Sequence, residues 1–152
     1  KGFHTLTPYM TVERCNDALQ FYQEAFGAKL LYTLSEPGGR IGHAEMRIGD
    51  SIFMLADPFP DWGVFAPQPG DKMTFRLHLS VKDVDAFVAR AVKAGAKIVR
   101  PVEDQFYGMR SGTIADPFGY TWIPGTQIEV VSPKEMQKRW NRMMSQPKES
   151  VS

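Results

Sequence analysis

The side chains best suited to chemistry in this sequence are two histidines and one glutamate in short, largely apolar segments. His43 and Glu45 lie two residues apart within 41–48, and His78 lies within 75–80. Side chains two apart on a β-strand point to the same face. His43 and Glu45 could therefore act as a general acid–base pair, since a neighbouring carboxylate raises the pKa of an imidazole.

The alternation of apolar and polar residues in both segments turns these side chains away from the predicted core. Three potential ligands, His43, Glu45 and His78, could then line one cavity and hold a relocated divalent metal. The simpler interpretation, which we favour, is that they are polar wall residues bonded to one another or to water. Arg76 shares the face of His78 and would either pair with Glu45 or bind a ligand carboxylate or phosphate.

Aromatic and sulfur-containing side chains are expected to complete a ligand-binding wall. These candidates are Tyr9, Met54, Phe106, Tyr107 and Trp122. Core packing is the default for each aromatic residue alone, but Phe106 and Tyr107 precede a glycine in a predicted loop. An aromatic pair in a loop more often touches a ligand or a partner, and Met54 could line an adaptable apolar pocket.

The elements that must position these residues occur twice in the chain. Gly27-Ala28-Lys29 returns as Gly95-Ala96-Lys97, 68 residues later. Each copy follows a predicted strand and amphipathic helix and precedes three predicted strands. A repeat at this spacing is typical of duplicated supersecondary units that share one core. The sequence therefore predicts an α+β fold of tandem βαβββ modules.

The expected boundaries follow from alternation, caps and turn residues. We expect the first helix to be capped by Asn16 or Asp17 and the second by Asp83. Strands are expected at 6–13, 29–35, 41–48 and 51–56, and then around His78 and at 97–101, 109–115 and 120–124.

The chain is expected to form one domain in four parts. Residues 1–57 are the first module, 58–74 the join, 75–131 the second module and 132–152 a C-terminal amphipathic helix and tail. The join is rich in proline but also carries Phe59, Trp62 and Phe65. We expect these rings to cover apolar surface, either over a pocket or against a partner subunit.

Composition excludes several classes of function. Lys and Arg number 18 and Asp and Glu 17, and they are interspersed, which argues against a nucleic-acid footprint. No apolar run approaches the roughly 20 residues of a membrane span. Cys15 is the only cysteine, so no internal disulfide can form, and we expect a reducing, cytoplasmic location.

The order of these segments resembles the vicinal oxygen chelate superfamily, which includes glyoxalases, bleomycin-resistance proteins and extradiol dioxygenases. The local sequence is most similar to its PhnB-like branch. The segments that carry the resemblance include His43-Ala44-Glu45-Met46-Arg47-Ile48-Gly49-Asp50, Asp116-Pro117-Phe118-Gly119-Tyr120-Thr121-Trp122 and Ser132-Pro133-Lys134-Glu135-Met136. The resemblance implies a cup of two β-sheets with helices outside, often in a homodimer.

The resemblance also implies where a metal would bind. Metal-dependent members place four ligands on the first and last strands of the two halves, and these places hold Thr7, Met54, Arg76 and Ile123. None is a good ligand for zinc or for a harder divalent cation. We therefore predict no cofactor, and His43, Glu45 and His78 as the ligands if a divalent metal is present.

Three functions are consistent with the sequence. The first is a homodimer that binds a small apolar or aromatic molecule in its cup without metal, like drug-sequestering members of the superfamily. The second is a metal-dependent lyase, isomerase or dioxygenase of the glyoxalase type with relocated ligands. The third is a dimeric scaffold whose cup is filled by its own side chains, for which the segment 59–65 is the natural filler.

Overall fold

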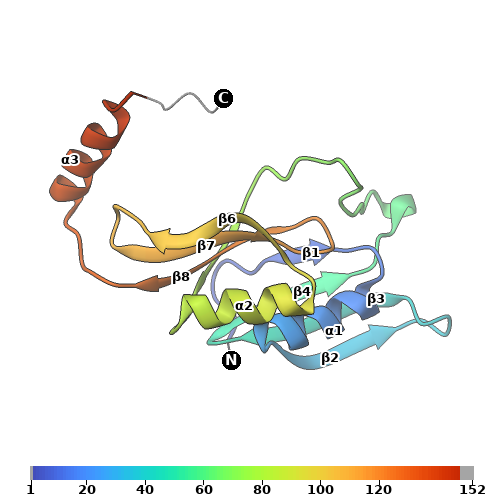
Figure 1. The fold of residues 1–152 in the computed structure, drawn as a ribbon. Coiled ribbons are helices and arrows are strands. Elements are labelled where there is room, and N and C mark those ends of the chain that lie inside the picture. Colours follow the sequence, from blue (N-terminus) through green and yellow to red (C-terminus); the bar gives the residue numbers. More distant parts are fainter. Residues whose placement is uncertain (1, 148–152) are drawn as a thin grey trace.

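The sequence repeat folds as two four-stranded β-sheets, each with its own helix (Figure 1). The computed structural model describes residues 2–147. The first module contains β1 (Tyr9–Thr11), α1 (Cys15–Phe26), β2 (Lys29–Ser35), β3 (Ile41–Ile48) and β4 (Ser51–Ala56). After a short 3-10 helix (Pro60–Trp62), the second contains β5 (Leu77–Ser80), α2 (Val84–Ala94), β6 (Lys97–Asp104), β7 (Met109–Ala115) and β8 (Thr121–Gln127), and α3 (Pro133–Met144) follows.

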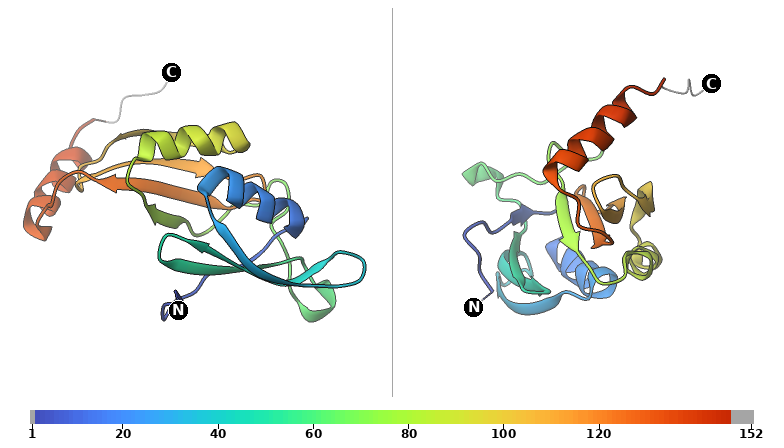
Figure 2. Two further views of the ribbon diagram at one scale, coloured as in Figure 1. Left: turned by 90° about the horizontal axis from the view of Figure 1, so that it is seen from below. Right: turned by 90° about the vertical axis from the view of Figure 1, so that its left-hand side faces the viewer.

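The two sheets have the same topology. Their strand orders are β1-β4-β3-β2 and β5-β8-β7-β6, with a parallel first pair and antiparallel pairs after it. This confirms the α+β fold of tandem βαβββ modules. Within residues 2–147 the sheets share no strand pair, so they do not close into one cup in a single chain. Instead α1 packs on the first sheet, α2 on the second, and the helices pack on each other (Figure 2).

An aromatic core joins the modules. Its largest rings are Phe21, Tyr22, Phe26, Phe53, Phe118 and Trp122. Tyr22 is fully buried, and its hydroxyl donates a 2.6 Å hydrogen bond to Asp116, which is 94 residues away in the sequence. Asp116 also accepts the indole N–H of Trp122 at 2.8 Å. The two modules therefore share one core and one buried hydrogen-bond network.

The start of α1 differs from the predicted cap at Asn16 or Asp17. The helix begins at Cys15, and the N–H of Cys15 donates to the buried carboxylate of Asp57 at 2.9 Å. The same carboxylate accepts the N–H of Ile41 at 2.7 Å. The acceptor lies just after β4, 42 residues beyond the helix start, so local sequence signals could not reveal it. The prediction was therefore wrong.

The second helix starts as predicted, with Asp83 accepting the N–H of Ala86. Its first N–H, from Val84, donates to Thr126 Oγ1 at 3.0 Å. Thr126 follows Val84 by the same interval as Asp57 follows Cys15. In both modules, a side chain at the equivalent position accepts the first N–H of the helix, but the residue type differs.

Three strand boundaries differ from those expected. β1 is restricted to Tyr9–Thr11, because Leu6 is 87% exposed and does not join the core. β6 continues through Pro101 to Asp104. It is an edge strand, where a proline need not interrupt the ladder. β8 begins and ends later than expected, at Thr121–Gln127.

The C-terminal helix stands away from the rest of the molecule (Figures 1 and 2). Ser132 caps it by accepting the N–H of Glu135, as the sequence predicts. Arg139 attaches it through the carbonyl of Phe106 at 3.0 Å and the carboxylate of Glu129 at 2.6 Å. The rest of the predicted tail, 148–152, lies outside the described residues. Among helices within 2–147, none is long and apolar enough to span a membrane.

Candidate functional site

The face of the first sheet that points away from α1 carries a row of four side chains in register. Tyr9 on β1 pairs with Met54 on β4, Met54 with Glu45 on β3, and Glu45 with Tyr32 on β2. Residues directly opposite on neighbouring strands share a face. His43, two residues before Glu45, lies on the same face, which we call the open face.

Four of these side chains form a continuous hydrogen-bond chain. The Tyr9 hydroxyl lies 2.8 Å from His43 Nδ1, and His43 Nε2 lies 3.0 Å from Glu45 Oε2. The Tyr32 hydroxyl donates to the same carboxylate oxygen at 2.5 Å. An ionised carboxylate can only accept, so the Nε2–H of His43 donates to Glu45. A neutral imidazole with these contacts is the Nε2–H tautomer, in which Nδ1 accepts from Tyr9.

The electrostatics of the open face favour an ionised Glu45. The hydrogen bond from Tyr32, followed by that from His43, lowers the pKa of Glu45 below its usual value. Burial, more than the nearby Glu45 charge, raises the pKa of Tyr9, so the phenol keeps its proton at neutral pH. The negative charge of Glu45 thus lies beneath the Tyr9 phenol and the His43 imidazole.

Replacement of Tyr32 by phenylalanine should raise the pKa of Glu45 towards its ordinary value, because the largest stabilising contact is lost. A carboxyl with a lowered native pKa binds fewer protons folded than unfolded, so it stabilises the fold above about pH 4.3 and loses this contribution as the pH falls. The variant should lose part of that acid dependence. A carbon-13 titration of the Glu45 carboxyl checks this.

The matched control is Tyr107→Phe, whose hydroxyl contacts Ser111 on the second sheet. This control should leave the titration of Glu45 unchanged. An unaltered Glu45 pKa in Tyr32→Phe would show that Tyr32 does not stabilise the carboxylate.

An aromatic loop, residues 59–64, stands beside the open face. Phe59 and Val64 exchange backbone hydrogen bonds, and Trp62 stacks on Phe59 with ring centroids 5.2 Å apart. A cavity of about 280 Å³ lies between the loop and the strands, lined by Tyr9, Thr11, Gly42, Ala56, Phe59, Trp62 and Val64. Trp62 remains 79% exposed. The loop therefore borders the open face and does not fill it.

The other sheet holds the remaining predicted ligands of the metal or anion. His78 pairs with Ile123 on the second sheet, and Arg76 lies exposed just before β5. The structure thus places His78 and the His43–Glu45 pair on different sheets. Within residues 2–147, no three His, Cys, Asp or Glu side chains are grouped so that they could hold a metal ion.

The aromatic candidates of the second module are also separate from the open face. Trp122 lies in the core, 3% exposed, and its indole N–H is bonded to Asp116. Phe106 and Tyr107 lie in the β6–β7 hairpin and, with Met109 and Met136, line a cavity of about 970 Å³ near α3. This cavity is formed by the second sheet and the C-terminal segment alone.

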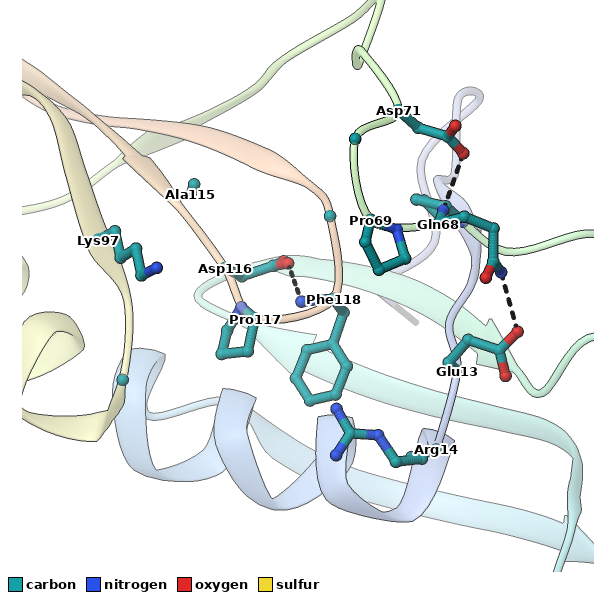
Figure 3. A pocket seen from close by; sticks show the side chains of 14 residues that line it. Glu13, Arg14, Gln68, Pro69, Asp71, Lys97, Ala115, Asp116, Pro117 and Phe118 are labelled. Carbon is teal, nitrogen blue, oxygen red and sulfur yellow. Dashed lines mark hydrogen bonds between the residues drawn. The ribbon is translucent and has the colours of Figure 1, made fainter.

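A further cavity of about 610 Å³ lies between the join and the turn after β7 (Figure 3). Glu13 and Asp71 both accept hydrogen bonds from Gln68 on this wall, and Arg14 lies over the ring of Phe118. Sequence analysis did not indicate this cavity, because its walls come from four separated segments. Gln68 engages the carboxylates of Glu13 and Asp71, and Asp116 is bonded within the core, so the cavity offers no catalytic pair.

Tyr32 is the member of the hydrogen-bond chain that sequence analysis missed. The segment 29–35 was expected to be a strand, but no side chain in it was singled out. The available signal was the turn at 36–39, which makes β2 and β3 a hairpin and brings Tyr32 opposite Glu45.

Solved structures of other proteins share this fold. TioX from Micromonospora sp. ML1 is 24% identical, with a TM-score of 0.65 over 82% of this chain and 98% of TioX. The fosfomycin resistance protein FosX from Listeria monocytogenes, solved with Mn(II) and sulfate, is 15% identical, with a TM-score of 0.62 over 90% of this chain and 97% of FosX. At these identities the likeness shows the fold alone.

In this single chain, the facing pairs on the first and last strands of each module suit a divalent metal poorly. These pairs are Tyr9 on β1 with Met54 on β4, and His78 on β5 with Ile123 on β8. A thioether and an aliphatic side chain are not ligands for a hard or borderline divalent cation.

Sequence comparison establishes the family. An uncharacterized protein of Mycobacterium bovis is 37% identical over 135 residues, which cover 87% of this chain and 89% of that protein. A family model described as the glyoxalase/bleomycin resistance protein/dioxygenase superfamily matches residues 3–123. With the paired βαβββ modules, this match shows that the chain belongs to the glyoxalase/bleomycin resistance protein/dioxygenase superfamily.

Proposed function

We propose that this protein binds a small apolar or aromatic molecule on the open face of the first sheet, without a metal ion. A second copy of the chain completes the site. The proposal places the chain with the PhnB-like, drug-sequestering type of the superfamily, acting in the cytoplasm.

The observation that carries the proposal is the large apolar surface left uncovered beside the hydrogen-bond chain. Tyr9, Tyr32 and Leu34 on the open face are about half exposed, at 54%, 46% and 60%, and Trp62 is 79% exposed. Contiguous exposed apolar surface of this kind marks an interaction site. Flat rings around a few fixed polar groups suit an aromatic ligand.

The size and openness of the cavity support completion by a second copy. The cavity of about 280 Å³ is at the lower limit of ligand sites, which span roughly 300–1,000 Å³. The edge strand of the second sheet also exposes Ile98 and Val99, at 53% and 58%. A dimer in which one module of each chain faces the other would cover both surfaces and enclose the ligand.

Removal of the Trp62 ring should weaken ligand binding about fivefold, since an aromatic contact is worth about 1 kcal/mol. The probe is 1-naphthol, a flat apolar molecule, titrated against wild type and Trp62→Ala by calorimetry. Trp140→Ala is the matched control, because Trp140 is also partly exposed but lies on α3. It should bind the probe as wild type does.

The proposal fails if wild type does not bind flat apolar probes, or if sedimentation shows only a monomer. Elemental analysis of the purified protein separates it from the metal-dependent alternative. Stoichiometric metal would favour ligation by His43, Glu45 and His78 across two chains. The self-filled scaffold is disfavoured, because the aromatic loop leaves a cavity beside Tyr9 unfilled and Trp62 stays 79% exposed.

A further inference from the structure

We propose that Tyr9, His43 and Glu45 form a metal-independent proton-transfer unit, in which the Tyr9 oxygen takes a proton from a bound carbon acid. The substrate class is a flat apolar or aromatic molecule with one C–H bond acidified by a neighbouring electron-withdrawing group. This inference rests on the ligand site proposed above and adds catalysis to binding.

The geometry selects Tyr9 as the group that meets the substrate. Both nitrogens of His43 are in use, Nδ1 with the Tyr9 hydroxyl at 2.8 Å and Nε2 with Glu45 at 3.0 Å. A ligand therefore cannot reach the imidazole without displacing the phenol. Tyr9 also lines the cavity beside the aromatic loop, whereas His43 and Glu45 do not, so Tyr9 is the member of the unit next to a ligand there.

Exposure decreases in order along the unit. Tyr9 is 54% exposed, whereas the side chains of His43 and Glu45 are 20% and 10% exposed. The outer group can exchange protons with a ligand, and the innermost is a carboxylate that stays charged. This is the order expected of a reacting hydroxyl, a base and an orienting carboxylate.

Tyr32 fixes the inner end of the unit. Its hydroxyl donates to Glu45 Oε2, the same oxygen that His43 contacts. Glu45 thus holds the imidazole with Nδ1 turned to Tyr9 and stabilises the imidazolium that forms. Tyr32 is a positioning residue, because it acts only through Glu45.

The proton-transfer step balances within the unit. The substrate C–H bond breaks, its proton goes to the Tyr9 oxygen, and the Tyr9 proton passes to His43 Nδ1. The electron pair stays on the substrate as a carbanion or enolate, or expels a leaving group. His43 then returns the proton to the product or to water, so no oxidant, reductant or metal is required.

The test uses 5-nitrobenzisoxazole, a flat aromatic carbon acid whose single proton transfer can be followed by absorbance. Loss of its C–H proton forms a nitrile and breaks the ring N–O bond, which releases a coloured phenolate. We expect the full-length protein to catalyse this reaction above the buffer rate. His43→Gln and Tyr9→Phe should each lower kcat/KM about 100-fold, the usual contribution of a general base.

Glu45→Gln keeps the shape of the site but removes its charge, and should lower kcat about tenfold with little change in KM. His4→Gln is the matched control, since His4 is an exposed histidine bonded to the Asp50 carbonyl and outside the unit. Imidazole added to His43→Ala should restore part of the rate. Circular dichroism and thermal melting of each variant exclude unfolding as the cause.

Each outcome decides the inference. A wild-type rate equal to buffer, with the probe bound in calorimetry, overturns proton transfer but leaves the proposed ligand site intact. A fully active Tyr9→Phe also overturns it, because the proton would then pass directly to His43. If no flat apolar probe binds wild type, the proposed function itself has failed.

Discussion

Replacement of Asp116 by alanine is expected to lower the free energy of unfolding by about 4 kcal/mol, because it leaves four buried donors without an acceptor. Oδ2 accepts from Tyr22 at 2.6 Å and Trp122 at 2.8 Å, and Oδ1 accepts the N–H groups of Phe118 at 2.8 Å and Tyr120 at 3.0 Å. Urea denaturation followed by circular dichroism measures the loss.

Asp116→Asn is the informative companion variant. Asparagine keeps the volume and one carbonyl oxygen, but it turns an N–H₂ group towards two donors, so we expect a loss of about 2 kcal/mol. Tyr22→Phe removes only one donor and should cost about 1 kcal/mol. If Asp116→Ala cost less than Tyr22→Phe, the carboxylate would not be the acceptor that joins the two modules.

Replacement of Asp57 by alanine is expected to cost about 3 kcal/mol, because two buried, charge-assisted hydrogen bonds are lost together. The carboxylate accepts the N–H of Cys15 at 2.9 Å and that of Ile41 at 2.7 Å. Its negative charge also lies at the N-terminus of α1, where the helix dipole favours it. Chemical denaturation of the variant measures the effect.

The second module and an exposed aspartate supply the controls. Thr126→Val removes the neutral acceptor at the start of α2 and should cost about 1 kcal/mol. Asp50→Ala changes a side chain that is 91% exposed and should stay within about 0.5 kcal/mol of wild type. Equal losses for Asp57→Ala and Asp50→Ala would contradict a special role of Asp57.

The sequence predicted the strands well where they form hairpins with clear turn residues. The bounds 29–35, 41–48 and 51–56 agree with β2, β3 and β4, because alternation and the turns at 36–39 and 49–50 are local signals. The start of α1 was missed, because its acceptor, Asp57, comes from a distant segment. A hydrogen bond between distant segments produces no recognisable sequence pattern near either the donor or the acceptor.

The candidate site was also predictable only where it depends on local sequence signals. The two-residue spacing of His43 and Glu45 is enough to put them on one face of a strand. Contacts of Glu45 with Tyr32, and of His43 with Tyr9, depend on the register between strands. That His78 belongs to another sheet depends on how the modules pack, which no local pattern specifies.

The core shared by the modules has a consequence for the origin of the chain. In this protein α1 is covered by α2, and Tyr22 of the first module finds its acceptor in Asp116 of the second. An ancestor with only one module would have left that helix face bare unless two polypeptides associated. Gene duplication and fusion would then have converted an interface between two polypeptides into a contact within one chain. After such a fusion the two halves could mutate independently. The acceptors at the starts of α1 and α2 could then differ, as Asp57 and Thr126 do.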